Sequence, residues 1–396
     1  MKIAISGAGI AGPTLAYWLL RTGHEPVLIE QAPELRTGGY VVDFWGLGFT
    51  VAERMGLRSR LDREGYKQRE VRFVDELSRK SGGFSTDVFG DLLGDRFTTI
   101  RRGALVKMIY EALEGRVETI WGDRICRMDE HPGGVTVTLE RGGAREFDLV
   151  IGADGLHSSV RALRFGPDAE YEKFLGYAVA AVEIEGYRPR DEGVYVIHPT
   201  ASHQLARMSL REDRTLFLFI FRCDAERAFT HLSASDVRAL LRDEFGGAGW
   251  EAGQILAQME RVDDIYFDRM SQIHMPSWRK GRCTLLGDAA AAVSLLAGEG
   301  TGLAMVEAYV LAGELGRAGD DYERAFAEYE RRLRPFLEAK QKTAAEFAST
   351  FVPKTEFGVW VRNVATKLMN IPGVGALFMG GSLKDDFELP DYSFSG

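Results

Sequence analysis

Two short apolar runs, with a longer segment between them, open the chain. Lys2–Ser6 and Glu25–Glu30 each have the length and apolar character of a buried strand. Ala11–Arg21 is long enough for a helix, and Gly23 provides a stop for that helix. The pattern therefore predicts strand, helix and strand in succession, the unit from which parallel sheets are built.

Glycines and one carboxylate occupy the junctions of this unit. Three glycines after the first strand have the spacing of a dinucleotide-binding fingerprint. The first permits a tight turn, the second lets the backbone approach a pyrophosphate, and the third lets the helix pack closely on the strand. A carboxylate that ends the second strand can accept hydrogen bonds from an adenosine ribose. A tight turn without a ligand is the alternative interpretation. The expected contacts are Gly7, Gly9, Ile10, Ala11, Gly12 and Glu30.

Two further turns that contain glycine and aspartate follow apolar strands. The predicted strand Phe147–Ile151 runs into Asp154–Gly155, and Cys283–Leu286 runs into Gly287–Asp288. The carboxyl ends of strands form the ligand site in open α/β sheets. A glycine-rich stretch, Gly298–Gly302, then precedes a helix, whose first turn offers backbone donors and a positive dipole end to an anion or a ring carbonyl.

The chain from about residue 171 to residue 275 has a different pattern. Alternating apolar positions predict antiparallel strands, and two segments have helical spacing. Phe217, Phe219 and Phe221 would share one face of a sheet, where a core face is favoured over the wall of a substrate pocket. Ordinary sheet surface is likewise favoured over substrate contact for His198, Gln204 and Arg207. The predicted strands are Tyr177–Glu185, Gly193–His198, Gln204–Leu210 and Thr215–Phe221, and the predicted helices are Ala234–Glu244 and Trp250–Gln258.

Other segments suggest supporting structure. Tyr40–Trp45 is apolar and aromatic but contains Asp43, which we interpret as a segment that runs against a flat ring rather than as a regular strand. Arg101–Leu113 has helical periodicity. Near the end, Tyr322–Ala348 predicts a charged amphipathic helix and Phe357–Met369 a second helical stretch, which together would brace both domains.

Composition narrows the classes of protein. A length of 396 residues, with 45% hydrophobic residues, allows two domains with a sizeable core. The net charge of −9 argues against nucleic acid as a partner. Charged residues interrupt the later apolar runs, so we expect no membrane span and a cytoplasmic location. The three cysteines form no close pair and the seven histidines are scattered, so no metal site is expected.

In combination, the three turns resemble the single-component flavoprotein aromatic hydroxylase family, the FAD monooxygenases built like para-hydroxybenzoate hydroxylase and the tetracycline-inactivating enzymes. The resemblance covers Met1 to about Leu315. It implies an α/β fold with a Rossmann-like FAD-binding domain formed by residues 1–70, 100–170 and 280–320. A mostly antiparallel β-sheet substrate domain would comprise residues 71–99 and 171–279, and residues 321–396 would form the C-terminal helical brace.

The resemblance also implies how the cofactors act. Asp288 would hold the ribityl chain of FAD, Glu30 the adenosine ribose, and the backbone around Gly300 the pyrimidine edge. NADPH or NADH would reduce the flavin transiently, and O2 would form a flavin hydroperoxide that oxygenates an aromatic or polycyclic small molecule. No side chain is assigned as a catalytic base. The remaining contacts implied by the family motifs are Arg36, Arg102, Asp154, Gly155, Gly287, Thr301 and Gly302.

Three positions depart from the family pattern. Ala291 and Leu295 stand where many relatives carry histidine and proline, and Glu299 replaces a frequent glutamine. These departures support a second hypothesis, in which the flavin is structural and the pocket promotes a non-redox step such as cyclisation in secondary metabolism. A ligand-binding module without catalysis is the third and least favoured hypothesis for a large two-domain nucleotide scaffold.

Overall fold

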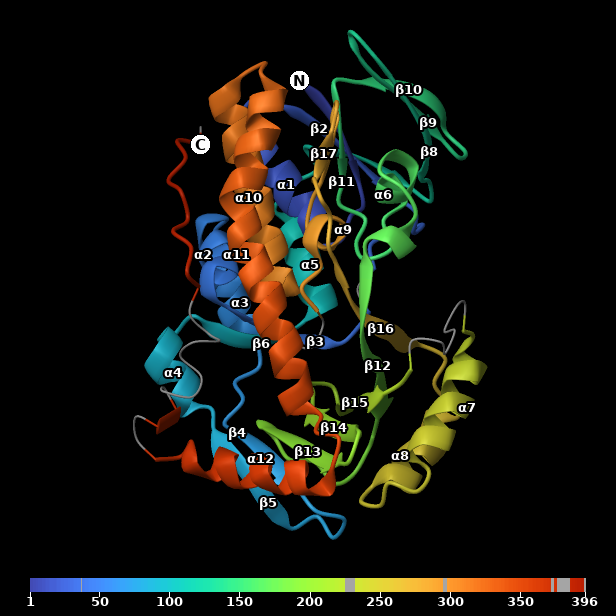
Figure 1. Ribbon diagram of the computed structural model, residues 1–396, viewed down its shortest axis with the longest axis vertical. Helices are drawn as coiled ribbons and strands as arrows, with labels where there is room; N and C mark the ends of the chain where they lie inside the picture. Colours follow the sequence, from blue (N-terminus) through green and yellow to red (C-terminus); the bar gives the residue numbers. More distant parts are fainter. Residues whose placement is uncertain (37, 225–231, 295–297, 372–373, 376–384, 395–396) are drawn as a thin grey trace.

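Two large sheets, one above the other in Figure 1, organise the structure. It is a computed structural model that describes residues 1–36, 38–224, 232–294, 298–371, 374–375 and 385–394. Strands β12 (Glu172–Glu185) and β16 (Ile265–Ile273) lead from the upper part into the lower sheet, and the long helix α11 (Tyr322–Phe351) runs beside both parts (Figure 1).

The upper sheet has six strands and is parallel except at one edge. Its central strand β1 aligns Ile5 with Leu28 of β2 on one side and with Ile151 of β11 on the other. Because these strands are parallel, their carboxyl ends meet along one edge of the sheet, where the three glycine-bearing turns lie. In spatial order the strands are β17 (Arg279–Lys280), β18 (Cys283–Leu285), β11 (Leu149–Gly152), β1 (Lys2–Ser6), β2 (Glu25–Glu30) and β7 (Glu118–Trp121).

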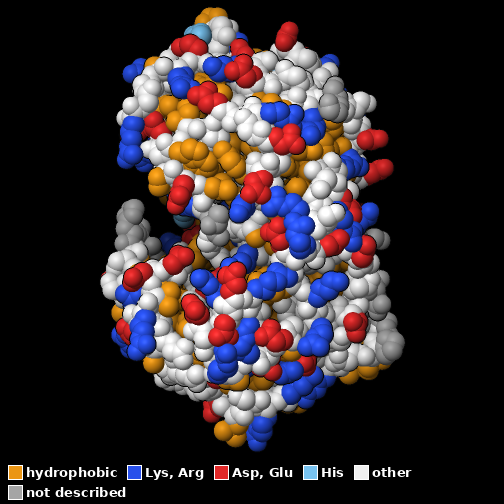
Figure 2. Space-filling model, turned by 180° about the vertical axis from the view of Figure 1, so that it is seen from behind, with side chains coloured by type: hydrophobic (Ala, Val, Ile, Leu, Met, Phe, Trp, Pro, Cys, Tyr) orange, Lys and Arg blue, Asp and Glu red, His pale blue; other side chains and the backbone are white. Residues whose placement is uncertain are grey.

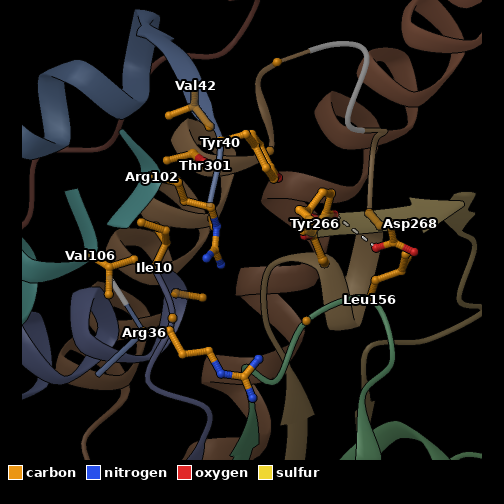
Figure 3. Close-up of a pocket in the computed structure, with 18 of the residues that line it drawn as sticks. Ile10, Arg36, Tyr40, Val42, Arg102, Val106, Leu156, Tyr266, Asp268 and Thr301 are labelled. Atoms are coloured by element: carbon orange, nitrogen blue, oxygen red, sulfur yellow. Dashed lines mark hydrogen bonds between the residues drawn. The ribbon is translucent and has the colours of Figure 1, made fainter. Parts of the chain in front are cut away.

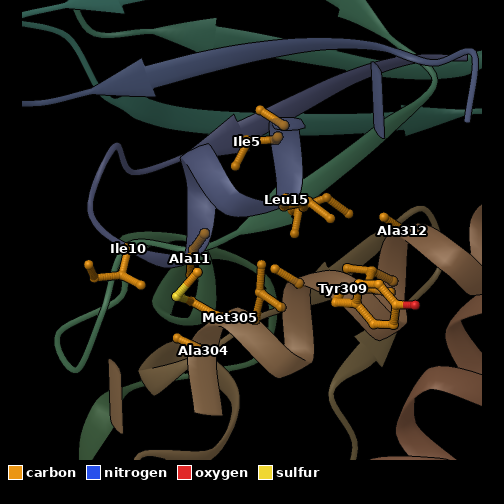
Figure 4. Close-up of a cluster of buried hydrophobic side chains, with 14 of the residues drawn as sticks. Ile5, Ile10, Ala11, Leu15, Ala304, Met305, Tyr309 and Ala312 are labelled. Atoms are coloured by element: carbon orange, nitrogen blue, oxygen red, sulfur yellow. The ribbon is translucent and has the colours of Figure 1, made fainter. Parts of the chain in front are cut away.

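Helices α1 (Ala11–Leu20) and α10 (Gly300–Ala318) pack together beside this sheet. Figure 4 shows Ile5, Leu15 and Met305 of α10 among the buried side chains where the sheet and the two helices meet. All three side chains are fully buried, and burial of each stabilises the fold by roughly 1.5–3 kcal/mol. Alanines on both helices permit the close approach, and this contact fixes the first turn against the start of α10.

The lower sheet has seven strands, all antiparallel except at the β13–β4 pair. Helices α7 (Ala234–Phe245) and α8 (Ala252–Met259) cover one face, and Phe217, Phe219 and Phe221 are buried against them. The predicted core face is therefore confirmed. In spatial order the strands are β16, β12, β15 (Arg214–Arg222), β14 (His203–Ser209), β13 (Val194–Thr200), β4 (Glu70–Val74) and β5 (Lys80–Ser85).

The remaining elements complete the two parts. An antiparallel three-stranded sheet comprises β8 (Ile125–His131), β9 (Gly134–Leu139) and β10 (Gly143–Phe147), and a two-stranded sheet pairs β3 (Val41–Trp45) with β6 (Phe97–Arg101). None of the described helices combines the length and the apolar character needed to cross a membrane. The other helices are α2 (Gly46–Arg54), α3 (Arg58–Glu64), α4 (Asp87–Leu93), α5 (Arg102–Glu111), α6 (Ser159–Arg164), α9 (Asp288–Ala291), α12 (Glu356–Leu368) and a 3-10 turn at Asp168–Glu170.

Two local predictions were wrong. Val41–Trp45 is a regular strand, because it pairs with β6 and thus satisfies its backbone groups despite the polar Asp43. Gly300 and Gly302 lie inside the first turn of α10 rather than before it. The α/β class and the predicted strand–helix–strand unit are confirmed, whereas the exact domain boundaries stay a prediction.

The C-terminal helices connect the two parts, as the brace interpretation requires. On α11, the Gln341 amide donates to the carbonyl oxygens of Ile273 at 2.8 Å and Ala292 at 3.0 Å. Helix α12 packs against β5, where the Asn363 amide donates to the Ser81 hydroxyl at 3.0 Å. These bonds link the tail to strands β16 and β5 of the lower sheet and to the residue that follows α9 in the upper part. Leu295 lies outside the described residues.

Candidate functional site

A cavity of about 480 Å³ extends from the carboxyl edge of the upper sheet to the inner face of the lower one. The three turns converge on it, although they are far apart in the sequence. The predicted cofactor contacts that line it are Gly7, Gly9, Ile10, Ala11, Glu30, Arg36, Arg102, Asp154, Gly155, Asp288, Gly300 and Thr301. The remaining predicted contacts, Gly12, Gly287 and Gly302, lie behind its wall.

The glycines of the first turn have separate structural roles. Gly7 has a φ of +106°, and a Cβ there would lie 2.5 Å from the Ala153 carbonyl oxygen. A Cβ on Gly12 would lie 2.0 Å from the Gly7 carbonyl oxygen, so Gly12 is required for α1 to approach β1. Gly9 differs, since a Cβ there would meet only the Arg102 side chain, at 3.5 Å. Gly9 therefore leaves the backbone open toward the cavity.

Gly302 also serves helix packing. A Cβ on Gly48 of α2 would lie 2.2 Å from the Gly302 Cα, and a Cβ on Gly302 would lie 3.5 Å from the Gly48 Cα. These two glycines let α2 and α10 approach each other closely. The first turn of α10 therefore keeps a fixed position, with Gly300 and Thr301 on the cavity side.

Glu30 and Asp154 are held by the protein itself. The Glu30 carboxylate accepts hydrogen bonds from the backbone N–H groups of Ala8 at 2.8 Å and Ala32 at 2.9 Å, and Arg36 lies 4.0 Å away. Two backbone donors leave carboxylate lone pairs available for a ligand hydroxyl. Asp154 is more fully occupied, because it accepts bonds from three serine hydroxyls and the Val160 N–H, and so fixes the turn that precedes α6.

Asp288 lacks such support. In the part of the chain that the structure describes, its carboxylate accepts no hydrogen bond from a protein side chain or backbone group, although it lies at the cavity wall. Burial raises the pKa of Asp288, and the positive charge of Arg102 partly offsets that rise. Figure 3 shows the Arg102 guanidinium directed into the cavity. A carboxylate at the cavity wall that has no protein donors fits a ligand that supplies hydroxyl groups.

A second carboxyl group, Glu307, supports this turn from behind. It is buried in α10, and it accepts hydrogen bonds from the Gly287 N–H at 2.8 Å and from the Tyr329 hydroxyl at 3.0 Å. Burial raises the pKa of Glu307 to about 8. Gly287 has a φ of +64°, a backbone conformation that favours glycine. The hydrogen bond from its N–H group to Glu307 holds the turn in this conformation. The glutamate thereby positions Asp288.

The lower end of the cavity is mostly apolar. Leu216, Leu218 and Ile220 of β15 line it from the face opposite to the three phenylalanines. Val179, Tyr195 and Met208 from neighbouring strands extend this wall. An apolar chamber beside a polar nucleotide site suits an organic ring system.

The polar strand residues do not reach this chamber. His198 bonds to the carbonyl oxygens of Val74 and Ala248, and Arg207 forms ion pairs with Asp191 at 2.8 Å and Glu251 at 3.0 Å. Both are buried rather than at the sheet surface, as is Gln204. They therefore stabilise the lower sheet. None of the three lines the cavity, in agreement with the prediction that they do not contact the substrate.

Several residues of the cavity wall were not named as individual contacts, although Tyr40–Trp45 was predicted to run against a flat ring. Tyr40 and Tyr266 lie against each other with ring centroids 4.8 Å apart, and the Tyr266 hydroxyl donates to Asp268 at 3.2 Å (Figure 3). Burial raises the pKa of Tyr40 to about 12. Asp43 also lines the cavity. In the sequence, only Asp43 stands out, because it is a charged residue within an apolar strand. The contact between Tyr40 and Tyr266 depends on tertiary structure and leaves no local pattern.

The face of the molecule seen from behind carries charges of both signs. Figure 2 shows basic and acidic side chains interspersed over the face seen from behind, which forms an upper and a lower lobe. Together with the net charge of −9, this distribution offers no extended basic patch on that face.

The fold and the cavity define a nucleotide-binding protein of the Rossmann-like class with an attached ligand chamber. The model of the FAD binding domain family matches residues 1–343. The chain belongs to this family, and the resemblance inferred from the three turns is confirmed.

Relatives and solved structures agree with this assignment. The chain is 33% identical over 396 residues to a flavin-dependent monooxygenase of an unknown prokaryotic organism, with 99% of each chain covered. It is 33% identical to a flavin-dependent monooxygenase of Legionella longbeachae, with 100% of this chain and 99% of the relative covered. The crystal structure of tetracycline destructase Tet(51) superposes with a TM-score of 0.82 at 31% identity, with 99% of both chains covered.

Proposed function

We propose that this protein is an FAD-dependent monooxygenase that uses NAD(P)H and O2 to oxygenate an aromatic or polycyclic small molecule. The observation that carries the proposal is the continuous cavity, in which the nucleotide turns meet an apolar chamber. Bound FAD would supply the redox chemistry that activates O2, which amino-acid side chains do not provide. The chain belongs to an FAD-binding family and is similar to proteins named flavin-dependent monooxygenases. Both findings favour this function over the hypothesis of a structural flavin.

The donor set of the cavity fits FAD. The Glu30 carboxylate would bind the adenosine ribose, the backbone at Gly9 and the start of α1 the pyrophosphate, and Asp288 the ribityl hydroxyls. The Arg102 guanidinium, which has no side-chain partner among the described residues, would bind a negatively charged or polar part of the cofactor. The N–H groups at Gly300 and Thr301 would face the pyrimidine edge of the ring, and Gly302 would support this turn through its packing against α2.

The other predicted contacts would support FAD binding without a direct side-chain hydrogen bond to the cofactor. Arg36 would add positive charge near the pyrophosphate from its exposed place beside Glu30. Asp154, Gly155, Gly12 and Gly287 would shape the turns rather than bind FAD through side chains. The lower chamber would bind the substrate, exclude water and hold the electron-rich ring beside the flavin.

The test begins with the purified protein. A flavin absorbance spectrum and release of FAD on denaturation are expected, followed by NADPH-dependent reduction without air and by O2 consumption when a substrate is present. Asp288→Ala should lose most bound FAD, because it removes the free carboxylate that faces the cavity. Asp263→Ala, at a carboxylate that is 96% exposed, is the control and should retain it. A colourless protein that takes up no FAD contradicts the proposal.

A further inference from the structure

Asp43 is an acidic group in the wall of the cavity, which also has many apolar residues. It lies on β3, directly opposite Thr99 of β6, and both residues line the cavity. The apolar residues that line the same cavity include Val71, Phe89, Phe97, Tyr195, Leu216 and Leu218. Asp43 is exposed toward this cavity, and the apolar side chains of the wall offer its carboxylate no hydrogen bonds.

The protein supplies Asp43 with little compensation. The Thr99 hydroxyl donates to its Oδ1 at 2.5 Å, and no other described residue donates a hydrogen bond to it. Within the described ranges, no Lys, Arg or His side chain lies within 4.0 Å of this carboxylate. Burial raises the pKa of Asp43, which the bond from Thr99 offsets only in part.

The other acids of the cavity are better supported. Glu30 accepts two backbone N–H bonds, Asp154 accepts bonds from three serines, and Asp268 accepts the Arg269 N–H at 2.8 Å as well as the Tyr266 hydroxyl. Asp288 lies near the charge of Arg102. Asp43 therefore has neither a cation nor a set of backbone donors, although it faces the chamber.

We propose that Asp43 binds a protonated amine of the substrate, so that the substrate is an aromatic or polycyclic skeleton that carries a basic nitrogen. The proposal rests on the proposed function, because it treats the lower chamber as the substrate site. An ammonium group donates hydrogen bonds and neutralises the carboxylate, whereas a neutral phenol hydroxyl would leave the negative charge uncompensated. The apolar wall would contact the rings, and Asp43 would fix their orientation.

Matched ligands test this assignment by isothermal titration calorimetry on the FAD-loaded protein. One pair is tetracycline and 4-dedimethylaminotetracycline, which lacks the basic nitrogen. The second pair is tyramine and 4-ethylphenol. For at least one pair, the cationic member should bind about tenfold or more tightly than the neutral one, as expected for a charge-assisted hydrogen bond. Asp43→Asn should reduce that preference to about threefold or less.

Tyr195→Phe is the matched control, since it removes a hydroxyl from the same chamber without changing its charge. It should retain the preference for the amine. Equal binding within both pairs, absence of binding by all four compounds, or an unchanged preference in Asp43→Asn overturns the proposal. FAD content and NADPH oxidation of the same samples report on the proposed function separately, because neither measurement depends on which ligand the chamber prefers.

Discussion

Gly9 and Gly12 belong to one fingerprint but have different neighbours. In Gly12→Ala, the new methyl carbon would lie 2.0 Å from the Gly7 carbonyl oxygen and 3.2 Å from a Leu28 methyl carbon. The oxygen is part of the backbone, so relief requires α1 and β1 to separate. Such overpacking costs about 3 kcal/mol. Alanine recovers up to about 1 kcal/mol through its higher helix propensity, so the free energy of unfolding should fall by about 2 kcal/mol.

Gly9→Ala should behave differently. Its methyl group would meet only the flexible end of Arg102 at 3.5 Å, which is an ordinary contact. The stability of the FAD-free protein should therefore change by less than about 0.5 kcal/mol. The same methyl group would stand where the backbone is expected to approach the pyrophosphate, so FAD should bind about tenfold or more weakly.

Urea unfolding of the FAD-free proteins and fluorescence titration with FAD measure the two effects separately. The expected pattern is a lower unfolding midpoint for Gly12→Ala and weaker FAD binding with a normal midpoint for Gly9→Ala. A normal midpoint for FAD-free Gly12→Ala would refute the packing argument. Wild-type FAD affinity of Gly9→Ala would refute the assignment of the pyrophosphate position.

Three further predictions concern buried groups. The pKa of Glu307 is raised from 4.5 to about 8 by burial, so the folded state binds its proton more tightly and stability should fall as pH rises between these values. Glu307→Gln keeps an acceptor and should remove this slope in urea unfolding at about pH 5 and about pH 9. Lys340→Met leaves the Glu299 and Asp385 carboxylates without their shared ammonium group, and guanidinium unfolding should show a loss of about 3–5 kcal/mol. Phe217→Ala should lower stability by about 3–5 kcal/mol in thermal unfolding. Leu218→Ala, on the cavity side, should instead mainly raise the KM for the substrate.

The sequence predicted the nucleotide part of the fold well because its signals are local. A strand, a glycine turn and a helix must follow each other within about thirty residues to form the unit, so their spacing is visible in the chain. The positions of Asp154 and Asp288 followed from the same rule, since parallel strands end along one edge. These turns needed no knowledge of distant contacts.

The strand status of Val41–Trp45 could not be predicted in this way. Asp43 and the glycines after it weaken the local pattern, while the backbone bonds that define the strand come from Phe97–Arg101, more than fifty residues later. Glu307 was missed for a related reason. Within the sequence it is one charged residue of a mostly apolar helix, and its role depends on Gly287 and on Tyr329 from α11.

The wall of the substrate chamber shows why specificity is harder to predict than the cofactor site. Strand β15 is apolar on both faces, with phenylalanines at 217, 219 and 221 and aliphatic residues at 216, 218 and 220. Alternation separates the two faces but does not say which one packs against protein. Helices α7 and α8 decide this by covering the phenylalanine face, and the aliphatic face is left to line the cavity. Residues that select the substrate therefore have the same sequence pattern as core residues, and a polar exception such as Asp43 becomes the position where substrate recognition can be tested directly.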